Sequence, residues 1–239
     1  LNPTNTIVRL GNNPNTQLGA VRNYTWLAKF NGSTGQNIWF QTFEDRLGYG
    51  LDLDGNDSIF ISGMIPNNAP NALYNQTTIP TGAPRGNQNA FFQSINPTTG
   101  SMGQFYIFGG LDDENFVDLV IDKDNNQAII ACLYAGNSSS FFWANTTINQ
   151  HAVLVADNPT NLAASNYHRF LTGIPRQLKL SYDPVGGDNF FYVVTSDRIQ
   201  KIEHRNLMSN LYNYPQTGTS KVDFLEVTPV DQKAYIIEE

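Results

Sequence analysis

The feature that most constrains this chain of 239 residues is a weak internal repeat. Segments 28–63 and 93–133 both run through a strand, a Thr-Gly turn, an aromatic strand, an alternating strand, an Asp/Asn turn and an apolar strand. The pair Thr34-Gly35 corresponds to Thr99-Gly100. Self-similarity over this length indicates an architecture built from repeated units rather than from one continuous sheet.

The repeat divides the chain into four units of about the same strand content. Clusters of Gly, Pro, Asn and Asp separate the apolar segments, and these residues supply turn geometries that β-branched residues resist. No segment shows the periodicity of an amphipathic helix. We expect an N-terminal extension over 1–23 and a single domain over 24–239, with units at 24–63, 89–136, 150–196 and 197–239 and a proline-rich insertion loop at 64–88.

Units of four strands at this spacing are typical of propeller blades. The sequence therefore predicts an all-β fold, β-propeller-like, with about four to five four-stranded antiparallel blades. Four units are few for a propeller. Either the insertions hide a fifth blade, or a strand from the N-terminus or from a neighbouring subunit completes the ring.

The run from Thr34-Gly35 to Trp39 resembles the Thr-Gly-x-x-x-Trp core of quinoprotein-like propeller repeats and of bacterial β-propeller repeat proteins. In those repeats the Trp packs between blades, so the resemblance implies a structural role for Trp39. The second unit keeps Thr99-Gly100 but has Gln104 where the Trp would fall. No counterpart of the quinone-binding residues is identifiable, so the resemblance informs the fold and not an activity.

Charge excludes two classes of partner. Charged residues make up 15% of the chain, the net charge is −7, and Lys and Arg form no basic stripe. The chain therefore lacks the positively charged surface that binding to nucleic acids or to anionic membranes requires. No apolar run approaches the roughly 20 residues that span a bilayer. The start at Leu1 leads us to expect a processed chain or a fragment of a longer one.

Asparagine takes much of the polar share, with 29 residues, and six of them begin an N-x-Ser/Thr sequon without a central proline. Sequons accept N-linked glycans in the loops of secreted proteins. We expect an extracellular or cell-surface glycoprotein. The expected sites, in order of preference, are Asn75, Asn137, Asn145, Asn31, Asn23 and Asn56.

A strand pattern precedes the first unit, at Thr6, Ile7, Val8, Arg9 and Leu10. In a closed ring such a strand completes the last blade. In an assembly it adds to a sheet edge of a neighbouring subunit. This segment is therefore the predicted assembly strand, and self-assembly or neighbouring subunits are the expected partners.

Alternating oxygen ligands occur at Asp52, Asp54, Asn56 and Asp57. Such a string suits Ca²⁺, although no Glu follows at the twelfth position of a calcium loop. A tight β-turn needs the same residues in the same places. The spacing recurs around Asp122, which favours the turn, so Ca²⁺ is the one cofactor left open and no other is expected.

No catalytic motif stands out. Asp112, Asp113 and Glu114 form a small acidic cluster that we interpret as a solvated loop. A cluster of Asp112, Asp113, Asp122 and Asp183 at one place in the fold would instead indicate acid–base chemistry. His151, His168 and His204 are too far apart in sequence to suggest a metal site. Cys132 lies in an apolar run and is expected to be a buried small residue.

Together these features favour a non-catalytic extracellular glycoprotein with a structural or assembly role, as a subunit of a surface filament or matrix. A carbohydrate-binding propeller is the first alternative, with sugar-stacking aromatic residues among Trp26, Trp39, Trp143, Tyr49 and Tyr106. A propeller hydrolase or lyase that uses acidic loops is the second alternative.

Overall fold

The computed structural model describes strands and their connections, and the described part of the chain contains no helix. The described residues are 7–8, 16–17, 24–44, 46–66, 88–109, 113–134, 141–143, 146–148, 150–162, 166–181, 190–196, 198–203, 210–215, 222–227 and 234–238. The predicted all-β class with antiparallel sheets is confirmed, in sheets of two to four strands.

Three sheets have four strands each. The first sheet is β5 (Leu47–Leu53), β6 (Ile59–Pro66), β7 (Gln88–Ile95) and β8 (Met102–Phe108). The second is β9 (Glu114–Asp122), β10 (Gln127–Tyr134), β13 (Ala152–Ala156) and β14 (Asn166–Phe170). The third is β15 (Pro175–Ser181), β16 (Phe190–Thr195), β17 (Arg198–Glu203) and β18 (Asn210–Pro215). Within each sheet, strands that follow one another pair antiparallel.

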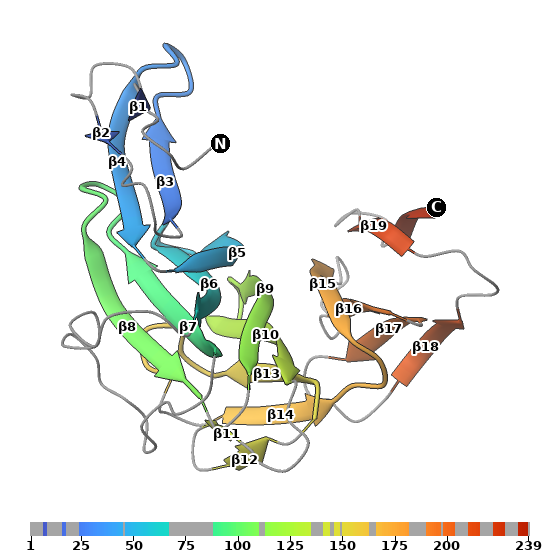
Figure 1. Ribbon diagram of the computed structural model, residues 1–239. Coiled ribbons are helices and arrows are strands. Elements are labelled where there is room, and N and C mark those ends of the chain that lie inside the picture. Colours follow the sequence, from blue (N-terminus) through green and yellow to red (C-terminus); the bar gives the residue numbers. More distant parts are fainter. Residues whose placement is uncertain are drawn as a thin grey trace.

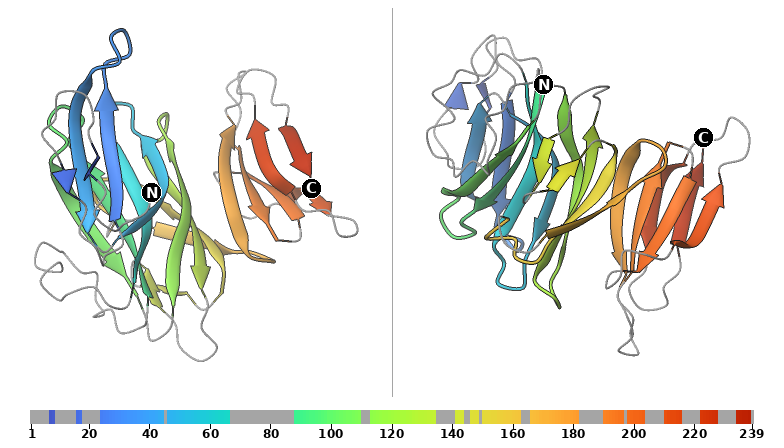
Figure 2. Two further views of the ribbon diagram at one scale, coloured as in Figure 1. Left: turned by 45° about the horizontal axis from the view of Figure 1, so that its top comes forward. Right: turned by 90° about the horizontal axis from the view of Figure 1, so that it is seen from below.

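Four hairpins form two-stranded sheets. They are β1 (Ile7–Val8) with β2 (Thr16–Gln17), β3 (Tyr24–Phe30) with β4 (Asn37–Glu44), β11 (Phe141–Trp143) with β12 (Thr146–Ile148), and β19 (Val222–Val227) with β20 (Ala234–Glu238). Figures 1 and 2 show that the sheets follow one another along a curved path, with β3–β4 at one end and β19–β20 at the other.

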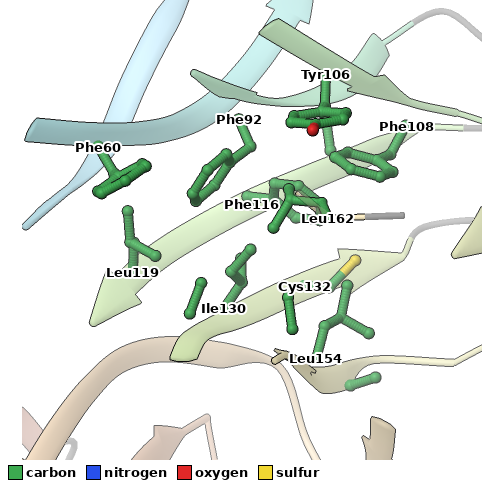
Figure 3. Close-up of a cluster of buried hydrophobic side chains, with 14 of the residues drawn as sticks. Phe60, Phe92, Tyr106, Phe108, Phe116, Leu119, Ile130, Cys132, Leu154 and Leu162 are labelled. Atoms are coloured by element: carbon green, nitrogen blue, oxygen red, sulfur yellow. The ribbon is translucent and has the colours of Figure 1, made fainter. Parts of the chain in front are cut away.

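The sheets stack because apolar residues face both sides of their strands. Alternate residues of β10 enter two different clusters: Ile130 and Cys132 pack toward the first sheet, and Ile129 and Ala131 toward the third. Figure 3 shows the cluster between the first and second sheets, in which Phe60 and Phe92 face Leu119 and its neighbours. A third cluster joins the β3–β4 hairpin to the first sheet.

We call the first strand of each sheet (β5, β9, β15 and β19) its inner strand. From β9 on, the inner strand of each sheet packs on the sheet before it. Strand β9 contacts β5, β6 and β7; β15 contacts β9 and β10; and β19 contacts β15. Gly50 of β5 allows the first of these contacts, because a Cβ there would lie 2.6 Å from the backbone nitrogen of Leu119. The order of the sheets along the path is therefore set by one repeated contact between inner strands.

Two turns are near copies of each other. In the β3–β4 turn, Gly35 donates to the carbonyl of Asn31 at 2.8 Å, and the Asn31 side chain accepts from two backbone N–H groups. In the β7–β8 turn, Gly100 and Asn96 make the same bonds. Both glycines have positive φ, 68° and 72°, which explains the Thr-Gly pair of the repeat.

The expected units and the observed sheets differ in phase. The first expected unit, 24–63, contains four strands, β3 to β6. However, β3 and β4 form a hairpin of their own, and β5 and β6 begin the first sheet. Each four-stranded sheet therefore starts in the middle of a predicted unit. A sequence repeat has no unique starting point, so strand order in space could not be read from it.

Two expected boundaries also shift. The insertion loop was predicted to begin at residue 64, whereas Met64, Ile65 and Pro66 continue β6 and pair with β7. Pro66 is tolerated there because the pairing of β6 with β5 ends at Met64, so that at Pro66 the strand has β7 alone as a described partner, as an edge strand would. At the N-terminus, Ile7 and Val8 pair with Gln17 and Thr16 within the chain, and the rest of 6–10 lies outside the described residues.

Candidate functional site

Exposed apolar side chains gather at the N-terminal end of the stack. Of nine large hydrophobic residues that are exposed in the described part, six come from β3, β4 and β5, with exposed fractions between 37% and 54%. They are Trp26, Phe30, Ile38, Tyr49, Leu51 and Leu53. A concentration of this kind on a soluble domain commonly marks a binding surface.

Two cavities lie along this end and share Leu27 and Leu51 as lining residues. The smaller, about 170 Å³, is bounded by Trp26 and Tyr49; the larger, about 460 Å³, is bounded by Phe30 and Leu53. Together we call them the β3–β5 groove, lined by Thr25–Phe30 of β3 and by Gly48–Leu51 and Leu53 of β5. The groove is mostly apolar.

The groove is held open by contacts at its two ends. At one end the Thr25 hydroxyl donates to the carbonyl of Arg46 at 2.8 Å and accepts from the N–H of Gly48 at 2.7 Å. At the other end the indole N–H of Trp39 and the ammonium of Lys29 both donate to the carbonyl of Pro97, at 3.1 and 2.9 Å. Between these ends β3 and β5 belong to different sheets.

Trp39 is buried and packs on the turn of the first sheet, as expected of a structural residue. A Cβ on Gly100 would lie 2.7 Å from Cδ2 of the Trp39 ring, so the turn and the ring are in direct contact. The side chain of Arg46 is also buried; it donates to Oε1 of Gln93 and lies 4.0 Å over the Phe105 ring. Burial lowers the pKa of Arg46 to about 10.

Among the described strands, none packs on one face of β5 in the way that β9 packs on the other face. The face that includes Gly50 meets β9, whereas Tyr49, Leu51 and Leu53 alternate on the other side and are exposed. In the next sheets the inner strand packs on the inner strand of the sheet before it, β9 on β5 and β15 on β9. The same rule would place an inner strand against Leu51.

The predicted acidic string forms a turn. Asp54 is buried, and its Oδ1 accepts from the N–H groups of Asn56 and Ser58, each at 2.8 Å. Asp57 has a φ of 61°. Oδ1 of Asp122 likewise accepts from two backbone N–H groups of its own turn, those of Asp124 and Asn125, at 3.0 and 3.2 Å. Within the described ranges no three His, Cys, Asp or Glu side chains lie together as a metal site requires.

Asp52 has a different role from its neighbours in the string, which the sequence did not reveal. Its Oδ1 accepts from the N–H of Leu53 at 2.8 Å, and its Oδ2 accepts from the N–H of Ile121 at 2.7 Å. Asp118 repeats this arrangement one sheet later, accepting from Leu119 and, at 2.7 Å, from Leu178. These two carboxylates bridge successive inner strands.

Burial is the main cause of the raised pKa of Asp118, and its two backbone hydrogen bonds partly oppose it. The Asp52 carboxylate lines an open hollow of about 510 Å³ with Lys123 and Asp124. Each Asp52 oxygen accepts a backbone hydrogen bond, so this carboxylate joins β5 to β9 at the edge of the hollow.

The acidic residues that would have marked a catalytic cluster do not come together where they are described. Asp113 directly precedes β9 and Asp122 is its last residue, so the other eight residues of the strand lie between them. At about 3.3 Å per residue the two residues lie at opposite ends of this strand. Glu114 begins β9 and is buried. Asp112 and Asp183 lie outside the described residues.

His151 accepts at Nδ1 from the N–H of Tyr134 at 3.1 Å, and His168 lies 4.9 Å from the Phe170 ring. Burial lowers the pKa of both imidazoles. Cys132 is fully buried, which also raises the pKa of its thiol, and it behaves as the expected small core residue. His204 lies outside the described residues.

The aromatic residues proposed for sugar stacking separate into two groups. Trp26 and Tyr49 are exposed and bound the same cavity, and the Trp26 ring lies 6.1 Å from that of Phe40. Trp39 and Tyr106 are buried. The side chain of Trp143 is outside the described part of the structure.

Two sequons are described. Asn31 and Asn56 are both exposed at turns, so a transferase could reach either residue. The other predicted sites, Asn23, Asn75, Asn137 and Asn145, lie outside the described residues.

Comparison with known proteins does not identify the chain. No protein-family model matches it, and no curated protein matches its sequence. Within the described residues, no helix has the length and apolar character needed to cross a membrane. The groove and the arrangement of the sheets are therefore the features of this chain that bear on its function.

Proposed function

We propose that this chain is a non-catalytic extracellular glycoprotein module with a structural role, a subunit of a surface filament or matrix. The fold that we propose is β-propeller-like, with four to five blades and with the four-stranded sheets as complete blades. Antiparallel four-stranded sheets that follow one another and pack face to face through successive clusters support it.

The observation that carries the proposal is the β3–β5 groove. Exposed apolar residues of β3, β4 and β5 surround a place where the repeated packing would put a strand. An edge strand beside an apolar face is a site where a partner strand can add, with main-chain hydrogen bonds for affinity and side chains for specificity. A low charged fraction and abundant sequons agree with an extracellular setting.

The test is electron microscopy of the native material, combined with the solution mass of the purified chain across a range of concentrations. We expect elongated or laterally joined particles and a mass that rises with concentration. Discrete monomers at every concentration would contradict the proposal. Removal of N-glycans with a glycosidase should lower the mass of the native protein, and an unchanged mass would remove the case for glycosylation.

A second candidate function has its own observation. Trp26 and Tyr49 are exposed on one cavity, and paired aromatic faces are suited to stacking on sugar rings. Titration with cello-, chito- and manno-oligosaccharides, followed by tryptophan fluorescence, tests this candidate. Binding that Trp26→Ala abolishes and Trp39→Phe retains would favour a lectin-like module; no binding by any of the three sugars would dismiss it.

A further inference from the structure

We propose that the β19–β20 hairpin of one copy of this chain completes the half-sheet β3–β4 of a second copy, with β20 pairing antiparallel to β3. This inference rests on the proposed self-assembly and specifies its contact. It names the occupant of the β3–β5 groove as a two-stranded segment that the chain itself carries.

The twin turns identify which half of a sheet β3–β4 represents. The turn that joins the third and fourth strands of the first sheet, Asn96 to Gly100, has the same hydrogen bonds as the turn from Asn31 to Gly35. The acidic turns, by contrast, join the first and second strands of the first and second sheets. By this correspondence β3–β4 is an outer half, the third and fourth strands of a sheet.

Packing identifies the other half. Strand β19 follows the third sheet and contacts β15, as β15 contacts β9 and β9 contacts β5. It therefore occupies the place of a first strand, and β20 that of a second. An inner half and an outer half add up to one sheet in the order β19-β20-β3-β4, the same order as in the first sheet.

The exposed apolar residues fall where such a sheet would cover them. Tyr49, Leu51 and Leu53 of β5 would receive β19, by the rule that inner strands pack on each other. Trp26, Phe30 and Ile38 lie on β3 and β4 themselves and would face the third sheet of the copy that donates the hairpin. The sequences of β19 and β20 are rich in apolar residues, including Phe224, Leu225 and Ile236.

A second copy fits the geometry better than closure within one chain. The two hairpins lie at opposite ends of the curved stack in every view (Figures 1 and 2). Bringing them together would require the clusters between the sheets to repack, and these clusters consist of side chains that are almost fully buried. Joining two copies leaves both clusters unchanged. Because the two surfaces differ, the contact is head-to-tail, and the filament form of the proposal requires that it repeat without closing into a ring.

Cysteine cross-linking tests the pairing directly. Cys132 is fully buried, so introduced thiols are the reactive ones. The double variant Ala28→Cys/Ile236→Cys places one thiol near the middle of β3 and one near the middle of β20. Oxidation, or a short bismaleimide that tolerates a shift in register, should give a ladder of dimers, trimers and longer species. The matched control is Ala28→Cys/Asn125→Cys, whose second thiol sits on an exposed turn.

Each outcome of the cross-linking decides the inference. A ladder above that of the control supports it, while a cross-linked monomer alone, or no product above the control, overturns it. Particles that assemble in the microscope without a 28–236 cross-link would leave the proposed function standing and remove this contact. Monomers in both experiments would remove both.

A second pair of variants separates assembly from folding. Leu51 is 54% exposed and Phe170 is 40% exposed, so neither change to Lys should lower the melting temperature of the monomer substantially. Leu51→Lys should reduce the assembled fraction at least tenfold, and Phe170→Lys, on β14 of the second sheet and outside the proposed contact, should leave it unchanged. Equal effects of the two variants would overturn the inference.

Discussion

At the scale of single residues, two turns with the same backbone have different surroundings. Gly35 and Gly100 both adopt positive φ, but a Cβ on Gly35 would meet nothing within 4 Å, whereas one on Gly100 would collide with the Trp39 ring. The pair therefore separates the cost of a backbone conformation from the cost of a collision.

We predict that Gly35→Ala lowers the free energy of unfolding by about 1 kcal/mol, the cost of positive φ for a residue with a Cβ. Gly100→Ala should lower it by about 2–4 kcal/mol, because displacement of a packed ring adds the penalty of an overfilled core. Urea denaturation of the two variants and the wild type measures both values. Equal losses would show that Trp39 does not rest on the turn as described.

At the scale of strands and turns, the sequence predicts well where strands occur and poorly which strands share a sheet. Strands separated by turns of Gly, Pro, Asn and Asp were expected, and the described part of the chain consists of strands and their connections. Alternation and turn chemistry are local signals, so they are visible in the sequence. The phase of the sheets depends on which hairpins lie next to each other, and that depends on packing between distant residues.

The candidate site was only partly visible in the sequence for the same reason. Trp26 and Tyr49 could be named as aromatic residues, but nothing in the sequence distinguishes them from the buried Trp39 and Tyr106. The groove exists because no described first strand of a sheet packs on the face of β5 that carries Tyr49, Leu51 and Leu53. This is a property of the arrangement and not of any motif. The paired bridges of Asp52 and Asp118 could have been suspected from the Asp-Leu dipeptide that both share.

The bridge between β9 and β15 should make stability depend on pH. Burial raises the pKa of Asp118 above its ordinary value, so the folded state binds this proton more readily than the unfolded state does. The favourable contribution is therefore full below the unfolded pKa and is lost as the pH rises through the folded pKa.

Asp118→Asn removes this titration while keeping an oxygen that can accept from Leu178. We expect the stability of the variant relative to the wild type to increase between pH 4 and pH 7, as measured by urea denaturation of both proteins. A difference that stays constant, or that falls as the pH rises, would contradict the raised pKa.

At the scale of the whole molecule, we expect local stability to differ between sheets, because each sheet is stabilised by the sheets that pack on it. The second sheet has clusters on both faces, and every residue from Ala128 to Cys132 and from Ala152 to Ala156 is fully buried. The β3–β4 hairpin is packed on one face and carries exposed apolar residues on the other. A linear arrangement of this kind opens from its ends.

We predict that amide hydrogen exchange is slowest in β10 and β13 and at least a hundredfold faster in β3. In assembled material β3 should become protected, while β10 should change little. Mass spectrometry after proteolysis resolves these segments. Equal protection of β3 and β10 in the monomer would contradict the expected order of opening.

Turns that begin Asn-Pro-Thr and the turn that begins Asn-Gly-Ser differ in whether they can accept an N-linked glycan. Asn96-Pro97-Thr98 and Asn158-Pro159-Thr160 would be acceptor sequences but for the central proline. In both turns a carbonyl accepts from a residue of another hairpin or sheet: that of Pro97 from Trp39, and that of Thr160 from Tyr106. The exposed turn at Asn31 has Gly32 in the central position and remains an acceptor. In a glycosylated chain, the central proline would prevent glycosylation at Asn96 and Asn158, whose turns contact other strands, while Asn31 could still carry a glycan.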